Sequence, residues 1–278
     1  MKHHLALLLL LAAGLAGCGG QHAEGRLALL VTDAPFPFEH VQSASVTLDR
    51  IAIDAGPDSS GTCRAIYQGA PRTIELSTLR NGNVLHLADG LLPTGTYRRL
   101  FVHLTEARLV LDTGEIFSSA DGTLGLPAMQ TQGCDLELDM PVVIEDDHWS
   151  RLLLDFDLAR SFVPQSDPGA VPSWRLEPLV HLVRPGQCGE IRGLVMSPDP
   201  LGGELGVADA TISFVPAGTE SVELAFATTS SDAGGSFTQL GLPPGSYDVH
   251  VQKGAVEVVV FGAEVRVCEY TLVDVYLP

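Results

Sequence analysis

The chain has 278 residues, which is enough for about two domains of ordinary size. It carries 34 acidic and 16 basic residues, and the resulting net charge of −18 repels the phosphate backbone of nucleic acids, which excludes them as partners. A hydrophobic fraction of 45% against a charged fraction of 18% excludes a disordered chain, and 29 Gly and 18 Pro among short Val, Thr and Leu runs favour β structure.

The N-terminus has the features of a secretory signal. Lys2 precedes 13 apolar or small residues, LALLLLLAAGLAG, a run that is too short to cross a bilayer as a helix. The segment Leu15–Cys18 reads L-A-G-C and resembles the lipobox of bacterial lipoproteins. That resemblance implies that residues 1–17 are removed and that the sulfur and new amino group of Cys18 are acylated. An ordinary secretory signal with a chance cysteine is the alternative.

The expected lipid anchor defines the compartment. Several acyl chains on one residue hold a protein firmly at a membrane, so the chain is expected in the bacterial cell envelope, bound through Cys18. Gly19 stands where lipoproteins retained at the inner membrane often carry Asp, which favours the outer membrane. Residues 18–25 then form a short lipidated tether before the first domain.

Residues 26–185 form the first expected domain, because apolar and polar side chains alternate there in short runs between turn residues. The expected strands are Gly25–Val31, Val41–Ile53, Thr73–Leu76, Tyr97–Glu106, Arg108–Leu111, Glu115–Ser118, Leu136–Val142, Leu152–Leu158 and Trp174–Leu182. A short helix is expected over Leu76–Leu87, broken near Gly82. So many short alternating strands favour a β-sandwich or a barrel.

Five segments of this domain are similar, in the same order, to a bacterial lipoprotein family known only as a domain of unknown function. They are LLVTDAP at 29–35, SASVTLDRIAI at 43–53, LLPTGTYRRL at 91–100, LLLDFDLARSFV at 152–163 and WRLEPLVHLV at 174–183. The resemblance implies an exported, Greek-key-like β-sandwich. It transfers no catalytic residues, because the family is tied to no reaction.

Residues 186–278 form the second expected domain, after the break at Pro185-Gly186-Gln187. The expected strand-bearing segments are Gly189–Val195, Val207–Phe214, Thr229–Phe237, Leu242–Val249 and Val265–Leu277. This domain is the more acidic per residue, with 12 acidic residues against 3 basic ones.

A turn motif links this domain to a known family. The segment Ser231–Phe237, followed by Pro244–Tyr247, resembles the signature of the carboxypeptidase regulatory-like, or transthyretin-like, seven-stranded sandwich. Asp232 is expected to accept backbone hydrogen bonds in that turn, the two glycines after it allow positive φ, and Phe237 returns to the core. The resemblance implies a non-catalytic module that serves as a spacer or a binding unit. The chain is therefore expected to be all-β, with two β-sandwich domains.

Four cysteines remain after Cys18, namely Cys63, Cys134, Cys188 and Cys268. In an exported protein they are expected to form disulfides, for which three pairings exist. The pairing Cys63–Cys134 and Cys188–Cys268 keeps each bridge inside one domain and closes loops of about 70–80 residues, each worth about 4 kcal/mol. A metal site is the alternative, although no two cysteines have C-x-x-C spacing.

Acidic side chains gather in one part of the first domain. Asp135, Glu137 and Asp139 share a face of an expected strand, and Asp146 and Asp147 lie in the next turn. Calcium takes six to eight oxygen ligands, so these residues are candidate calcium ligands if neighbouring strands bring them together. A solvated outer face explains the same residues more simply. No other cofactor is expected.

The remaining polar candidates are also interpreted as surface residues. Asp155 and Asp157 alternate with apolar residues on a later strand, and His103 and His181 lie mid-strand opposite aliphatic side chains. Trp149, beside the acidic turn, is the one candidate platform for stacking on a ligand such as a sugar ring.

No catalytic motif occurs in the sequence: there is no G-x-S-x-G, P-loop, G-x-G-x-x-G or H-E-x-x-H. We therefore expect a non-enzymatic, lipid-anchored envelope protein with a binding or adhesion role at the cell surface, whose partner is a glycan or an envelope protein. A periplasm-facing structural or accessory subunit of an envelope complex is the alternative. A glycan-processing hydrolase with two carboxylates is a remote alternative, because nothing indicates the burial that a catalytic acid needs.

Overall fold

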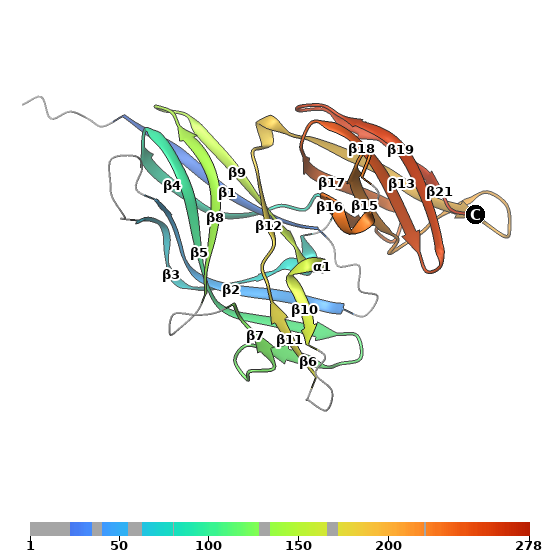
Figure 1. The fold of residues 1–278 in the computed structure, drawn as a ribbon, viewed down its shortest axis with the longest axis horizontal. Helices are drawn as coiled ribbons and strands as arrows, with labels where there is room; N and C mark the ends of the chain where they lie inside the picture. Colours follow the sequence, from blue (N-terminus) through green and yellow to red (C-terminus); the bar gives the residue numbers. More distant parts are fainter. Residues whose placement is uncertain are drawn as a thin grey trace, which may run out of the picture.

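The computed structural model describes residues 23–34, 41–54, 63–79, 81–127, 134–165, 172–219 and 221–278. These residues form β-strands almost throughout, so the predicted all-β fold is confirmed. Figure 1 shows two groups of strands beside each other: β1 to β12, in blue to yellow, and β13 to β21, in orange to red. Cys18 and the signal segment lie outside the described residues. Within the described part, no helix is long and apolar enough to cross a membrane.

The first domain contains strands β1 to β12 in three sheets. One sheet has the order β12-β9-β1-β4, the second has the order β3-β2-β5-β6 with β8 also paired to β5, and a small third has the order β10-β11-β7. The strands are β1 (Glu24–Ala34), β2 (Val41–Asp54), β3 (Cys63–Glu75), β4 (Leu85–Pro93), β5 (Gly95–Leu111), β6 (Ile116–Ser118), β7 (Leu124–Gly125), β8 (Cys134–Ile144), β9 (Trp149–Asp157), β10 (Phe162–Gln165), β11 (Ser173–Leu176) and β12 (Val180–Val183).

One hydrophobic core joins the two larger sheets of this domain. Alternate residues point into it, such as Leu27 and Leu29 of β1 and Leu100 and Leu104 of β5, none more than 3% exposed. Each buried leucine contributes about 1.5–3 kcal/mol relative to an exposed one. The alternation visible in the sequence therefore fixes which face of each strand is buried.

The helix predicted over Leu76–Leu87 is wrong. The described residues of this stretch, 76–79 and 81–87, contain a single 3₁₀ turn, η1 (Leu76–Thr78), and β4 already begins at Leu85. Asn81 and Gly82 have φ values of +60° and +75°, a left-handed conformation that a right-handed helix does not accommodate.

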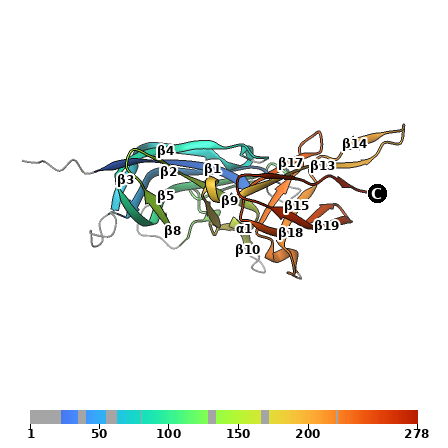
Figure 2. The same cartoon turned by 90° about the horizontal axis from the view of Figure 1, so that it is seen from above.

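The second domain packs two sheets face to face. One has the order β14-β13-β17, with β20 and β21 also paired to β13, and the other has the order β16-β15-β18-β19. Figure 2 shows these two layers, with β13 and β17 above β15, β18 and β19. The strands are β13 (Gly189–Pro198), β14 (Glu204–Gly206), β15 (Thr211–Pro216), β16 (Ala227–Ser230), β17 (Ser236–Leu242), β18 (Gly245–Lys253), β19 (Val256–Val265), β20 (Tyr270–Leu272) and β21 (Val275–Tyr276). Its core includes Ile191, Val195, Phe214, Phe237 and Val249.

The predicted turn between β16 and β17 has the expected hydrogen bonds. Asp232 Oδ1 accepts from the backbone N–H groups of Gly234 and Ser236, both at 2.9 Å. Gly235 has a φ of +81°, and Phe237 is only 1% exposed. The turn thus begins β17 with a side chain that enters the core.

The second domain also covers one face of β9. Leu152, Leu154 and Phe156 belong to the core of the first domain, whereas Leu153 faces the other way. On that side a separate apolar cluster joins the two domains, and it consists of Leu30, Leu153, Val183, Cys188 and Leu240. We call this contact the domain seam. The 3₁₀ turn η2 (Pro185–Gln187) connects the domains beside it.

Candidate functional site

Two acidic side chains of β9 lie buried near the domain seam. The solvated face predicted for Asp155 and Asp157 is wrong, because their exposed fractions are 2% and 1%. Asp157 is fully paired: it accepts from the backbone N–H of Arg160 at 3.0 Å and forms an ion pair with the Arg160 guanidinium at 2.6 Å. It thereby caps the short helix α1 (Leu158–Ser161).

Asp155 has much poorer partners. Its Oδ2 accepts only from the Gln239 amide of the second domain at 3.4 Å, and its Oδ1 has no partner among the described residues. Burial, and next the negative charge of Asp157, raise the pKa of Asp155 to about 7. The structure therefore favours the protonated carboxyl over the carboxylate at this position.

His181 lies opposite Asp155 in the ladder between β12 and β9. The exposed position predicted for it is wrong, because its ring packs against Phe226 of the second domain, with ring centroids 5.0 Å apart. Its Nε2 is buried without a partner in the described part of the chain, and burial lowers the pKa of the ring. Burial near the domain seam thus favours the neutral forms of both Asp155 and His181. His103, which was also predicted to be exposed, is partly buried with Nδ1 2.6 Å from Asp49 Oδ1.

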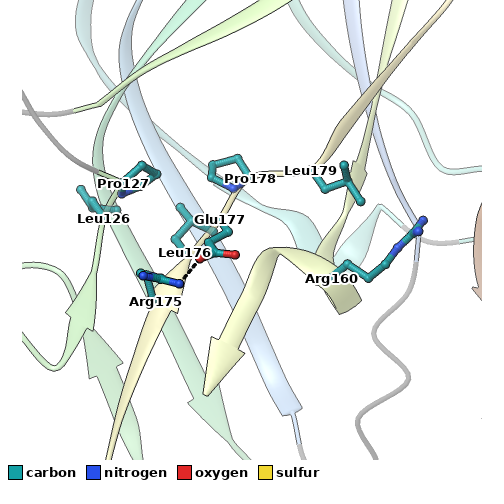
Figure 3. A pocket seen from close by; sticks show the side chains of 8 residues that line it. All are labelled: Leu126, Pro127, Arg160, Arg175, Leu176, Glu177, Pro178 and Leu179. Carbon is teal, nitrogen blue, oxygen red and sulfur yellow. Dashed lines mark ion pairs between the residues drawn. The ribbon is translucent and has the colours of Figure 1, made fainter. Parts of the chain in front are cut away.

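An open groove of about 540 Å³ lies near α1 and β11 in the first domain, as Figure 3 shows. Its lining is mainly apolar and consists of Leu126, Pro127, Arg160, Arg175, Leu176, Glu177, Pro178 and Leu179. Arg175 forms an ion pair with Glu177, and Arg160 forms the ion pair with Asp157. Because a neighbouring carboxylate neutralises each guanidinium, the groove offers an anion little net attraction.

A second candidate surface is the outer face of the sheet around β13. The segment that contains β20 and β21 points Val273, Val275 and Leu277 into the core and the alternate residues outward. The outward residues on this face are largely apolar, and with their exposed fractions they are Leu194 (40%), Tyr270 (57%), Leu272 (66%) and Tyr276 (56%). We call these four residues the tyrosine face. They lie on neighbouring strands, because β20 and β21 both pair with β13.

Charged groups surround the tyrosine face. The Arg192 guanidinium lies 5.0 Å from the ring centroid of Tyr270 and pairs with Glu190. Glu204 on β14 and Glu269 before β20 are exposed beside the face, whereas Asp274 lies within it, between Leu272 and Tyr276, and accepts from the Leu194 N–H at 3.0 Å. The face therefore alternates large apolar side chains with charged ones, most of them negative, and protein interfaces commonly mix the two kinds of residue.

The structure does not assemble the predicted calcium ligands. Asp135 lies 3.0 Å from an Arg50 nitrogen, and Glu137 lies 2.9 Å from one of Arg99. Asp139, Asp146 and Asp147 are exposed, and in the described part of the chain no group of three acidic, His or Cys residues is placed to hold a metal ion. The acidic face of β8 is thus occupied by arginines of neighbouring strands.

The predicted ligand platform Trp149 begins β9 and is 51% exposed. The Arg26 guanidinium lies 5.3 Å from its ring centroid. Trp174, by contrast, packs on the core beside Phe117, with ring centroids 6.0 Å apart. One accessible ring with a cation over it is a smaller surface than the tyrosine face.

The predicted disulfide residues are thiols in the structure, as far as they are described. Cys63 and Cys268 are exposed and Cys188 is buried, whereas the side chain of Cys134 lies outside the described residues. Cys188 and Cys268 are nevertheless neighbours, because the Cys268 N–H donates to the Cys188 carbonyl at 2.8 Å. The Cys188–Cys268 pairing therefore stays a prediction with a compatible backbone.

Sequence reasoning missed both Tyr270 and Tyr276 as candidate binding residues. The signal was present, because the segment from Tyr270 to Leu277 carries large apolar side chains at both alternating positions. A strand with one solvated face normally has polar residues at every second position. An aromatic residue on the expected solvent side therefore indicated a contact surface.

Comparison with solved structures found remote similarity to bacterial pilin subunits. The crystal structure of the minor pilin GBS52 from Streptococcus agalactiae has 9% sequence identity and a TM-score of 0.26, covering 90% of this chain and 94% of that one. The shaft pilin SpaA from Lactobacillus rhamnosus GG has 11% identity and a TM-score of 0.23, covering 92% and 97%. Similarity this remote supports no argument about function. No curated protein matches the sequence significantly.

A family match covers most of the first domain. Residues 24–178 match the family described as Domain of unknown function (DUF4382), and this stretch is more than half of the chain. It includes β1 to β11, and therefore all of the groove lining except Leu179, the acidic strand β8 and both buried aspartates. The chain belongs to the DUF4382 family.

Proposed function

We propose that this protein is a non-enzymatic, lipid-anchored protein of the bacterial cell envelope that binds a protein partner through the tyrosine face. The observation that carries the proposal is the exposure of four large side chains, two of them tyrosines, on one sheet face. Contiguous exposed apolar surface rimmed by polar residues is typical of interaction sites. Tyrosine and arginine are enriched in the centres of protein interfaces, and both occur here.

The charge of the second domain narrows the chemistry of the partner. Residues 189–278 contain 12 acidic and 3 basic residues, and the charged residues on and beside the tyrosine face follow that bias. A partner with an apolar patch and a basic rim complements it, and the rate of association should fall as salt is added. A glycan partner would depend mainly on the two rings and little on Leu272 or on salt.

The lipid anchor and the compartment rest on the sequence. The L-A-G-C segment at Leu15–Cys18 supports acylation of Cys18, and Gly19 supports the outer membrane. The second domain, proposed as a carboxypeptidase regulatory-like module, then lies at the end of the molecule opposite to the start of β1 (Figure 2).

Replacing Leu272 with Asp is expected to weaken partner binding at least about 30-fold, because a charge at the centre of an apolar contact removes a dominant interaction. The partner is first trapped by a photo-crosslinking residue at position 272 in intact cells, then purified, and its affinity is measured at two salt concentrations. Phe261→Asp is the matched control, since Phe261 is 75% exposed on β19 of the opposite sheet. Equal affinity of both variants, or no crosslink at position 272, would contradict the proposal.

External protease is expected to remove the protein from intact cells, as a cell-surface role requires. The measurement compares intact cells, lysed cells and a Cys18→Ser strain by immunoblot. Cleavage that appears only after lysis would instead support the alternative, a periplasm-facing accessory subunit that uses the same face.

A further inference from the structure

The two cysteines of the second domain stand just before neighbouring strands, Cys188 before β13 and Cys268 before β20. In the parallel ladder between β13 and β20, Glu190 lies beside Tyr270 and Arg192 beside Leu272. Extending that register back by two residues places Cys188 beside Cys268. A hydrogen bond from the Cys268 N–H to the Cys188 carbonyl, 2.8 Å long, joins the two residues, and Cys268 stands in the turn before β20 with a φ of +59°.

The backbones are close enough for a bond between the two sulfurs. Neighbouring strands are about 4.8 Å apart, and disulfides span Cα distances of about 4.4–6.8 Å. The chains are in close contact here, because a Cβ on Gly189 would lie 2.2 Å from the Arg266 carbonyl oxygen. The backbones of the two residues are therefore adjacent, as a disulfide between them requires.

The two thiols differ in a way that suits stepwise oxidation. Cys188 is buried at the domain seam, where its thiol donates to the Pro185 carbonyl at 3.5 Å. Burial, and next the nearby Cys268, raise the pKa of Cys188. Cys268 is exposed, so an oxidant reaches it first.

We propose that Cys188 and Cys268 form a disulfide that fastens the segment containing β20 and β21 to the domain linker. The bond thereby regulates partner binding at the tyrosine face. The oxidant is a disulfide compound, either a dithiol–disulfide oxidoreductase or oxidised glutathione. The Cys268 thiolate attacks one sulfur of that disulfide, and one oxidant thiolate leaves. The Cys188 thiolate then attacks the Cys268 sulfur of this mixed disulfide and expels the second thiolate of the oxidant. The protein loses two electrons and two protons, and the oxidant is reduced to two thiols.

The bond affects the tyrosine face because Cys268 stands just before β20. Tyr270, Leu272 and Tyr276 belong to a segment whose ladder partner is β13. The bond joins the start of this segment to residue 188 and closes a loop of about 80 residues, which restricts the unfolded chain. In the oxidised protein the segment opens less often. This regulatory part rests on the proposed function, whereas the bond itself does not.

The test uses the purified chain with Cys18→Ser, so that only four thiols remain. After equilibration with oxidised glutathione, we expect a cross-linked 188–268 peptide in a non-reducing digest. We also expect a melting temperature at least about 5 °C above that of the reduced protein. Cys268→Ser should abolish both effects, and Cys63→Ser, the matched control, should keep both. Alkylation of both Cys188 and Cys268 after equilibration, or Cys188 linked to another cysteine, would overturn the proposal.

A second measurement separates the bond from its role. Affinity for the crosslinked partner is compared between the oxidised and the reduced chain, and reduction should lower it at least about 3-fold. Unchanged affinity would overturn the regulatory part. If Leu272→Asp leaves binding intact while the 188–268 peptide still forms, the proposed function fails and the disulfide stands.

Discussion

Replacing Asp155 with Asn should stabilise the protein at pH 8 and leave its stability at pH 4 almost unchanged. The folded-state pKa of Asp155 is about 7, whereas an unfolded aspartate titrates near pH 3.9. Below about pH 4 the carboxyl is protonated in both states, so it contributes no pH dependence. Between about pH 4 and pH 7 only the unfolded state ionises, and this lowers the free energy of unfolding of the natural protein.

The size of this effect follows from the difference between the two pKa values. About three pKa units correspond to about 4 kcal/mol at pH values above 7, which is a large share of the stability of a domain. Asn has the same shape, does not ionise and can still contact the Gln239 amide. Urea unfolding of both chains at pH 4, 6 and 8 measures the effect.

Asp157→Asn is the matched control, because Asp157 lies on the same strand and is equally buried. Asp157 is paired with Arg160 and caps α1, so its replacement leaves a guanidinium without its counter-charge. Asp157→Asn is therefore expected to destabilise the protein near neutral pH, in the opposite direction to Asp155→Asn. Parallel stability–pH curves for the natural chain and Asp155→Asn would show that Asp155 ionises freely in the fold.

Replacing Gly193 with Ala should destabilise the second domain by about 3 kcal/mol or more and displace the strand that bears the tyrosine face. A Cβ at this position of β13 would lie 1.8 Å from the carbonyl oxygen of Val273 and 2.8 Å from the Phe237 ring. No choice of side-chain rotamer relieves a clash with backbone, so the segment that follows β20 must move away. The two tyrosines move with it.

Hydrogen exchange measures this displacement directly. The Val273 N–H donates to the Arg192 carbonyl and the Leu277 N–H to the Met196 carbonyl, both at 2.8 Å, and both amides should lose protection in Gly193→Ala. Gly186→Ala is the control, because a Cβ there meets no atom within 4 Å. Unchanged protection at both amides would mean that β13 and the segment containing β20 and β21 tolerate the methyl group that Gly193→Ala adds between them.

Most of the fold could be predicted from alternation, because one buried face imposes period-two patterning on a strand. The pattern of β5 was of this kind, whereas β2 alternates in sequence but is buried on both faces over Ala44–Leu48; both strands are present. The alternation in β9 was interpreted as one core face and one solvent face. A second domain covers that other face, and a sequence pattern does not show which part of the chain covers a strand. The environments of Asp155 and His181 were therefore predicted wrongly.

The candidate site was harder to predict than the fold. Asp135 and Glu137 share a strand face with acidic neighbours, but their actual partners, Arg50 and Arg99, come from other strands. Local charge density suggested a cation site, whereas the sheet register supplies arginines instead. The grouping of the tyrosine-face residues depends likewise on the register of β20 and β21 with β13.

The position of β1 in its sheet determines when the first domain can fold. This strand lies between β4, with which it is antiparallel, and β9, with which it is parallel, and Arg26 pairs with Trp149. The earliest strand of the domain therefore remains incomplete until residues far along the chain are available. Such distant pairing slows folding, because a long loop must close before the contacts form. A chain made in N-to-C order therefore leaves one edge of β1 unpaired until residues 149–157 have been made.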